Sequence, residues 1–202
     1  MVDFWHDGKW NNKNVVQCPN SHNWVVIHNY FTDEQCDNIV NERVKWTSYE
    51  GTVFDSDEAQ IHTDIRRVNV YEPPKSFDWL KDFLWSTLQK ANSDNWKFEL
   101  EGIGEPPILL EYISPGAKYI WHMDLGKKGP STNRKILFVV LLNDEFEGGD
   151  LNIFFGGCNN QTMPLKKGSI VMFPSYTLHE VEEVLKGTRY TLAGWAGGNT
   201  FR

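Results

Sequence analysis

Short strand-like runs follow one another from Pro107 to the end of the chain. Turn-forming groups such as Ser114-Pro115-Gly116, Gly148-Gly149-Asp150 and Lys186-Gly187 separate them. Close-spaced strands divided by such turns favour an antiparallel sandwich or barrel. The runs that we predict as strands are 108–113, 118–122, 136–142, 151–155, 169–173, 180–185 and 189–196.

The first half of the chain predicts two amphipathic helices that would each pack one side on a sheet. Thr32 and Gln35 have the spacing of a capping box, and Ser76 is expected to begin the second helix. The helical stripes are Cys36, Ile39, Val40 and Val44 in the first helix, and Phe77, Leu80, Leu84, Leu88 and Ala91 in the second. Strands are expected at 24–30 and 65–71, an arm at 1–23 and a loop at 47–64.

Composition places the chain among ordinary soluble globular proteins, with 40% hydrophobic and 23% charged residues. Its 202 residues predict a single domain, in which 1–106 form the arm, flanking helices and supporting strands and 107–202 form the β-rich core. The net charge of −7 argues against a nucleic-acid-binding protein, so nucleic acid is an unlikely partner. The short basic pairs 66–67 and 127–128 are interpreted as solvated surface.

Three cysteines, Cys18, Cys36 and Cys158, form no CxxC pair, which argues against a disulfide framework or a cysteine zinc site. The N-terminus has no secretory pattern, and no apolar run reaches the length of a membrane span. A reducing, cytoplasmic compartment without membrane attachment is therefore the expectation. Oligomeric state is left open.

His122 and Asp124 are two residues apart, so on a strand their side chains would share a face. His179 follows a later predicted strand and turn. Two histidines and a carboxylate are the facial set of ligands typical of non-haem Fe(II) oxygenases. On spacing alone, hydrogen-bonded core histidines and a turn aspartate remain an equal alternative.

The chain resembles the prolyl-4-hydroxylase-like branch of the Fe(II)/2-oxoglutarate-dependent dioxygenases. The resemblance rests on Tyr112-Ile113-Ser114-Pro115-Gly116, His122-Met123-Asp124, Glu147-Gly148-Gly149-Asp150-Leu151, Leu178-His179-Glu180-Val181 and Gly187-Thr188-Arg189-Tyr190. It implies a mainly β (α+β) fold, with a double-stranded β-helix (jelly-roll) core and about two N-terminal flanking helices. It also implies Fe(II), 2-oxoglutarate and O2, with ascorbate as an accessory reductant. The reaction that it implies is hydroxylation of a C–H bond, with a prolyl residue of a peptide or protein as the leading substrate and with release of succinate and CO2.

The resemblance assigns the residues of the site. His122, Asp124 and His179 would be the catalytic metal ligands. Arg189 would pair with the far carboxylate of 2-oxoglutarate, as a planar guanidinium can do through two hydrogen bonds, and Tyr112 would donate its hydroxyl to the same molecule.

Substrate contacts follow from strand alternation. Thr191, Ala193 and Trp195 would share the face of Arg189, which leaves room for the cosubstrate and makes Trp195 a wall of the substrate pocket. Trp121 should point to the opposite face. Tyr119 has the same parity as Trp121, yet the family places an aromatic residue here near the substrate. Lys118 and Arg134 are candidates for the pocket rim.

Several other functions remain as alternatives. The substrate could be a free amino acid or another small molecule instead of a prolyl residue. A nucleic-acid demethylase would carry a second arginine six residues after the cosubstrate arginine, where this chain has Trp195. Outside this chemistry, the histidines and the aspartate could belong to a non-catalytic metal-binding β-sandwich or to a zinc enzyme.

Overall fold

The computed structural model describes residues 23–55, 58–154 and 160–201. It also describes the backbone of three short strands near the N-terminus, β1 (Trp5–His6), β2 (Lys9–Trp10) and β3 (Val15–Gln17). Cys36 is buried and free, whereas Cys18 and Cys158 lie outside the described residues. None of the helices in this described part of the chain is long and apolar enough to cross a membrane.

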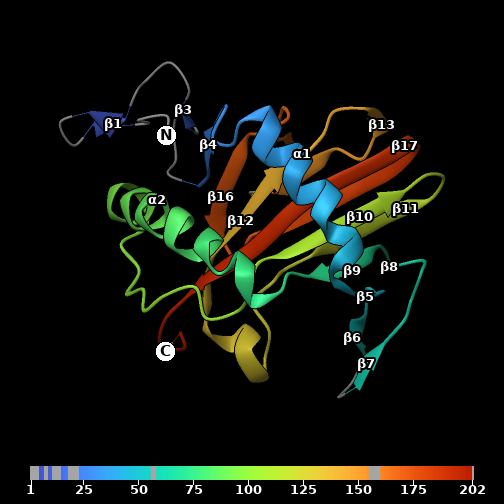
Figure 1. Cartoon of the computed structure of the whole chain (residues 1–202). Helices are drawn as coiled ribbons and strands as arrows, with labels where there is room; N and C mark the ends of the chain where they lie inside the picture. The colour runs from blue at the N-terminus through green and yellow to red at the C-terminus, as the bar shows by residue number, and fades with distance from the viewer. Residues whose placement is uncertain are drawn as a thin grey trace.

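Two antiparallel layers that share one long strand make up the jelly roll (Figure 1). The major layer has the order β3-β4-β16-β12-β17-β10-β9-β5. Its further strands are β4 (Val25–Ile27), β5 (Thr47–Glu50), β9 (Asn69–Glu72), β10 (Ile108–Ile113), β12 (Arg134–Leu141), β16 (Ile170–Pro174) and β17 (Leu178–Gly197). The minor layer contains β8 (Arg66–Arg67), β11 (Ala117–His122), β13 (Phe146–Gly148), β14 (Leu151–Phe154) and β15 (Asn160–Thr162). The mainly β fold predicted from the sequence is confirmed.

The shared strand β17 corrects the prediction of two strands at 180–185 and 189–196. It runs unbroken for 20 residues, and its first part pairs with β11, β13 and β14 while its second part pairs with β10 and β12. Gly187 bends it without ending it, at a φ of +77° that side chains rarely adopt. A Cβ there would lie 2.5 Å from the Glu145 carbonyl oxygen, so the neighbouring chain also requires glycine.

Two helices cover the outer face of the major layer (Figure 1). Helix α1 (Asp33–Glu42) begins with the predicted capping box, in which Thr32 Oγ1 accepts from the Gln35 backbone and Gln35 Oε1 accepts from the Thr32 backbone. Helix α2 (Trp79–Asn95) follows a short 3-10 turn, η2 (Lys75–Phe77), so Ser76 lies before the helix instead of beginning it. Both helices bury apolar side chains against the sheet.

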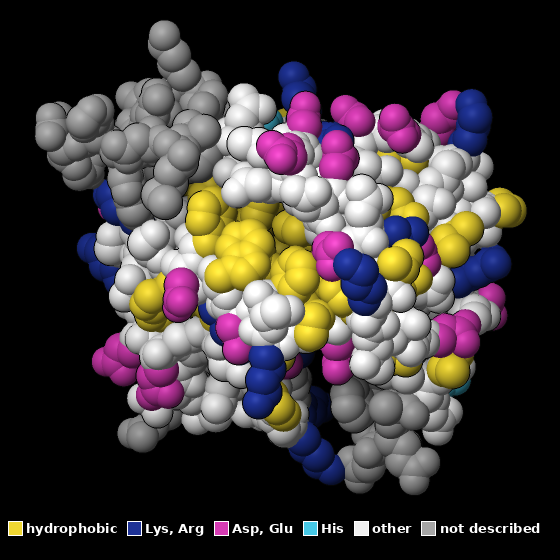
Figure 2. All heavy atoms as spheres, viewed as in Figure 1, with side chains coloured by type: hydrophobic (Ala, Val, Ile, Leu, Met, Phe, Trp, Pro, Cys, Tyr) yellow, Lys and Arg dark blue, Asp and Glu magenta, His cyan; other side chains and the backbone are white. Residues whose placement is uncertain are grey.

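Two hydrophobic clusters fill the molecule. The outer one lies between the helices and the major layer, and it includes Ile39 and Leu84 with Phe138 of β12. The inner one lies between the two layers, and it includes Leu151 and Trp195. Val44, in the 3-10 turn η1 (Arg43–Lys45), is 74% exposed and is not part of the helical stripe predicted for it. Figure 2 shows apolar side chains at the surface on the helix-covered face.

The expected loop at 47–64 contains three strands, which corrects that prediction. Strand β5 pairs with β9, and β6 (Val53–Asp55) and β7 (Glu58–Gln60) form a hairpin. All four β5 side chains are exposed, so this edge strand has no apolar alternation that a sequence could display. The predicted strand 65–71 is divided into β8 and β9, which pair with different layers. The predicted strand 24–30 is limited to β4, and β13 and β15 were not predicted.

The buried carboxylate of Glu111 joins the 3-10 turn η1, which follows helix α1, to the sheet. Glu111 of β10 is 6% exposed and accepts hydrogen bonds from Arg43, Asn69 and Tyr71. Burial alone would raise the pKa of Glu111, but these hydrogen bonds outweigh it and lower the pKa.

Candidate metal centre

The side chains of His122, Asp124 and His179 converge at one end of the inner cluster. Each offers one ligand atom, and these atoms lie within 4.8 Å of one another. Nε2 of His122 is 3.6 Å from Asp124 Oδ1, and Nε2 of His179 is 3.9 Å from Asp124 Oδ2. The two histidines are register partners across β11 and β17, so sheet pairing itself brings them together.

Backbone carbonyls orient both imidazoles. Nδ1 of His122 lies 2.7 Å from the Ile120 carbonyl oxygen, and Nδ1 of His179 lies 2.9 Å from that of Thr177. A carbonyl only accepts, so each Nδ1 donates its proton, and each Nε2 is the ring nitrogen that lies nearest Asp124. These hydrogen-bond partners could not be identified from the sequence.

The protonation states in the site suit a cation. Burial, reinforced by His179, lowers the pKa of His122 to about 3 and keeps its imidazole neutral. Burial would raise the pKa of Asp124, but the nearby histidines and the Trp195 hydrogen bond lower it instead. The neutral His122 imidazole and the Asp124 carboxylate therefore face one another beside His179.

Asp124 is held by two hydrogen bonds, although β11 ends at His122 and leaves Asp124 beyond the strand. Its backbone N–H donates to the Ser175 carbonyl oxygen at 3.0 Å, and Trp195 Nε1 donates to its Oδ2 at 2.9 Å. The Arg134 guanidinium lies 3.6 Å from the centre of the Trp195 ring. Both carboxylate oxygens of Glu105 accept from Arg134, at 2.7 and 2.6 Å. Trp195 is thus a support for the aspartate as well as a pocket wall.

The side chain of Tyr119 faces the same side of β11 as His122. Regular alternation along the strand would instead have placed it on the same face as Trp121. The Tyr119 ring stacks on the His122 ring with 3.4 Å between centroids and 15° between planes. The cause is a register shift, because Tyr119 pairs with Val181 and His122 with His179, so three steps on β11 match two on β17. Such a bulge reverses the alternation of side chains.

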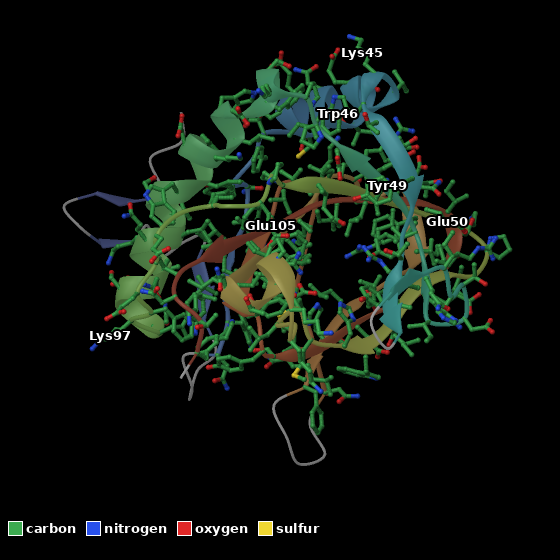
Figure 3. All side chains as sticks on the ribbon, turned by 90° about the horizontal axis from the view of Figure 1, so that it is seen from below. Lys45, Trp46, Tyr49, Glu50, Lys97 and Glu105 are labelled. Atoms are coloured by element: carbon green, nitrogen blue, oxygen red, sulfur yellow. The ribbon has the colours of Figure 1, made fainter. Side chains whose placement is uncertain are left out.

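A cavity of about 650 Å³ opens beside the three residues. The predicted face of β17 lines it, with Arg189, Thr191, Ala193 and Trp195 in alternation, and Tyr112 of β10 lines it as well. Tyr49 on β5 and Glu105 also line it, and both are labelled in Figure 3.

Arg189 lies deep in this cavity, only 2% exposed. Its Nη1 and the hydroxyl of Thr191 are buried, and neither has a hydrogen-bond partner among the described residues. Its guanidinium lies 5.4 Å from the centre of the Tyr112 ring. Buried donors without acceptors are costly, so this end of the cavity requires an anionic or acceptor-rich ligand.

Some cavity residues differ from the sequence predictions. Arg134 lines the cavity and Trp121 does not, both as predicted, whereas Lys118, a candidate for the rim, is not among the lining residues. Arg66 lines the cavity and does not belong to solvated surface. Nothing in the sequence signals this, because its position follows from the pairing of β8 with β11, where Arg66 stands opposite Tyr119.

The fold and the site together define a jelly-roll protein with a facial set of two histidines and one aspartate. Residues 108–197 match the family model of the 2OG-Fe(II) oxygenase superfamily. This segment is similar to that superfamily, and it makes up somewhat less than half of the chain.

Curated relatives are similar over the same half of the chain. A PKHD-type hydroxylase of Synechococcus sp. (strain CC9605) is 39% identical over 92 residues, which are 44% of this chain and 40% of the relative. A PKHD-type hydroxylase of Synechococcus elongatus is 31% identical over 119 residues, covering 55% of this chain and 53% of the relative. The chain thus spans about half or less of the length of the curated relatives it matches.

Solved structures are similar over most of the fold. A prolyl-4-hydroxylase from Pseudomonas putida has a TM-score of 0.67 and 20% identity, covering 88% of this chain and 94% of that one. A Trichoplax adhaerens prolyl hydroxylase in complex with a hypoxia inducible factor peptide fragment has a TM-score of 0.69 and 17% identity, covering 88% and 84%. At this identity the likeness establishes the shared fold.

Proposed function

We propose that this chain is an Fe(II)- and 2-oxoglutarate-dependent dioxygenase that hydroxylates a C–H bond, with a prolyl residue of a peptide or protein as the first candidate substrate. The observation that carries the proposal is the position of Arg189 in the cavity that also contains His122, Asp124 and His179. Arg189 is buried, and its Nη1 has no hydrogen-bond partner among the described residues. A purely structural metal site has no use for such an arginine.

The residues present fit the implied groups. His122, Asp124 and His179 would hold Fe(II) through two neutral nitrogens and one anionic oxygen, which suits a facial set with three positions left for other ligands. Arg189 would pair with the far carboxylate of 2-oxoglutarate, and Thr191 supplies a buried hydroxyl beside it. Tyr112, which lines the cavity next to Arg189, would donate its hydroxyl to the same molecule.

When bound, iron and 2-oxoglutarate supply the oxidation: O2 converts 2-oxoglutarate to succinate and CO2, and one oxygen atom enters the substrate C–H bond. The protein holds the reacting groups in place. Trp195 and the Ser175 carbonyl hold Asp124 through hydrogen bonds, and the Ile120 and Thr177 carbonyls hold the imidazoles. The apolar walls from Val139 and Ala193 limit water beside the site.

The prolyl substrate is supported by the names of related proteins. The Pseudomonas and Trichoplax proteins carry prolyl hydroxylase titles, and the latter is in complex with a peptide. A free amino acid or other small molecule is the alternative substrate, and ascorbate as accessory reductant stays a prediction.

The test is 2-oxoglutarate consumption by the purified, Fe(II)-loaded protein with proline-containing peptides, free amino acids and single-stranded DNA. Succinate formation and a product heavier by one oxygen atom are expected with the peptides. Arg189→Met should raise the 2-oxoglutarate KM about 10- to 100-fold, because a charged hydrogen-bonding pair is lost. The proposal would be contradicted if no substrate led to succinate formation, or if Arg189→Met left the 2-oxoglutarate KM unchanged.

A further inference from the structure

Arg66 lines the cavity, and one stacked ring, that of Tyr119, separates it from the proposed metal ligand His122. Its guanidinium carbon lies 4.8 Å from the centre of the Tyr119 ring, which itself stacks on His122. Nη1 of Arg66 donates to the Thr52 carbonyl oxygen at 2.8 Å, which secures the side chain to the segment before β6. Its Nε is buried and has no hydrogen-bond partner in the described structure.

The cavity carboxylates are all engaged elsewhere. Among the described lining residues these are Glu72, Glu105 and Asp124. Glu72 accepts from the Tyr49 hydroxyl at 3.0 Å, Glu105 forms a two-point pair with Arg134, and Asp124 belongs to the metal centre. No ion pair joins any of them to Arg66.

The charges around the metal centre and of Arg134 balance without Arg66 and Glu72. The two positive charges of Fe(II) and that of Arg189 would match Asp124 and the two carboxylates of 2-oxoglutarate, and Arg134 is matched by Glu105. Among the described lining residues, the charge of Arg66 is then left with that of Glu72, which accepts from the Tyr49 hydroxyl and forms no ion pair with Arg66. A partly buried guanidinium with an unused buried N–H is stabilised by an anion that arrives with the ligand.

We propose that Arg66 binds a carboxylate of the substrate, so that the hydroxylated C–H bond lies close to an acidic group. This rests on the proposed function and narrows its substrate class to molecules with a free α-carboxylate, or with an acidic side chain, next to the reacting residue. Arg66 on β8 would then bind the substrate carboxylate, and Arg189 on β17 would bind 2-oxoglutarate elsewhere in the same cavity.

The test compares probes that differ only in the carboxylate. N-acetyl-L-proline and its amide test a terminal carboxylate, and N-acetyl-Asp-Pro-amide and N-acetyl-Asn-Pro-amide test an acidic side chain. Binding to the Mn(II)-loaded protein with saturating 2-oxoglutarate is followed by calorimetry, which needs no turnover. The Fe(II)-loaded protein is assayed in parallel for succinate.

In at least one of the two pairs, the wild-type protein should bind the probe with the carboxylate about 10- to 100-fold more tightly than the corresponding amide. This is the difference that a charged hydrogen-bonding contact predicts. Arg66→Gln should reduce that preference to about threefold or less, and Arg66→Lys should keep part of it because the charge remains. Arg67→Gln is the matched control, since Arg67 is exposed and donates to the Pro115 carbonyl oxygen, away from the cavity. This control should retain the full preference.

Three results would overturn the inference. The wild-type protein could bind both members of each pair equally, or it could bind neither pair. A folded Arg66→Gln protein could also keep the full preference for the carboxylate. Thermal unfolding of the apoprotein checks that this variant folds. Succinate formation tests the proposed function separately. A protein that prefers the acid in calorimetry but never forms succinate would refute the dioxygenase and leave the carboxylate site standing.

Discussion

Replacing Trp195 with phenylalanine removes one hydrogen bond from the metal centre and leaves an aromatic ring in place. In the structure Trp195 Nε1 donates to Asp124 Oδ2 at 2.9 Å, and the guanidinium of Arg134 lies over the Trp195 ring. Phenylalanine keeps a ring for Arg134 to cover but has no donor. The Asp124 carboxylate, with a side-chain exposure of 12%, has little water to replace the lost partner.

The expected loss follows from the charge and burial of the acceptor. A hydrogen bond to a charged group contributes about 1.5–3 kcal/mol, which corresponds to roughly 10- to 150-fold in an equilibrium constant. Removing a partner that orients a metal ligand typically costs about 10- to 100-fold in metal affinity. We therefore expect Trp195→Phe to weaken Mn(II) binding by about 10- to 100-fold.

The assay is a calorimetric titration of Mn(II) into the apoprotein, with thermal unfolding to check that each variant folds. Trp121→Phe is the matched control, because it is the same substitution at a residue of β11 that does not line the cavity. The Trp121 ring contacts Phe154 instead. The control should bind Mn(II) as the wild type does. Equal affinities for Trp195→Phe and Trp121→Phe would refute the supporting role assigned to Trp195.

Three further predictions concern stability. Gly187→Ala should lower the free energy of unfolding by about 1–3 kcal/mol in urea titrations, because of its positive φ and the Glu145 carbonyl, whereas Gly104→Ala, with open space around it, should change it little. Thr32→Ala should cost about 0.5–2 kcal/mol through the lost helix cap, and an unchanged urea midpoint would contradict this. Glu111 has a lowered pKa in the folded protein, so its stabilising effect is present above the unfolded value of about 4.3 and is lost as pH falls through the folded pKa. Glu111→Gln should therefore flatten the acid side of the stability-against-pH curve, and an acid limb as steep as that of the wild type would refute it.

Features that depend on local chemistry could be predicted from the sequence. The capping box of Thr32 and Gln35 needs only neighbouring residues, and the strand at 108–113 matches β10 because its apolar run is bounded by turn signals. Regular alternation placed Arg189 and Trp195 on one face, since β17 is regular over this part. Spacing together with the family resemblance indicated the three residues that the structure brings together at the metal centre.

Features that depend on strand pairing could not be predicted. The bulge in β11 that turns Tyr119 toward His122 exists only relative to β17. The position of Arg66 depends likewise on its pairing with β11, and Glu105 reaches Arg134 across 29 residues of chain. Lys186-Gly187 has the composition of a turn, but strands on both sides of it pair with one continuous β17. In each case the neighbouring strand supplies the missing information.

Anaerobic titration of Fe(II) into the apoprotein, with and without 2-oxoglutarate, tests most directly that one site holds both. We expect one Fe(II) per chain, tighter binding when 2-oxoglutarate is present, loss of Fe(II) binding in His179→Ala, and loss of the 2-oxoglutarate effect alone in Arg189→Met. Fe(II) bound equally well by His179→Ala, or a 2-oxoglutarate effect that survives in Arg189→Met, would contradict the assignment of the site.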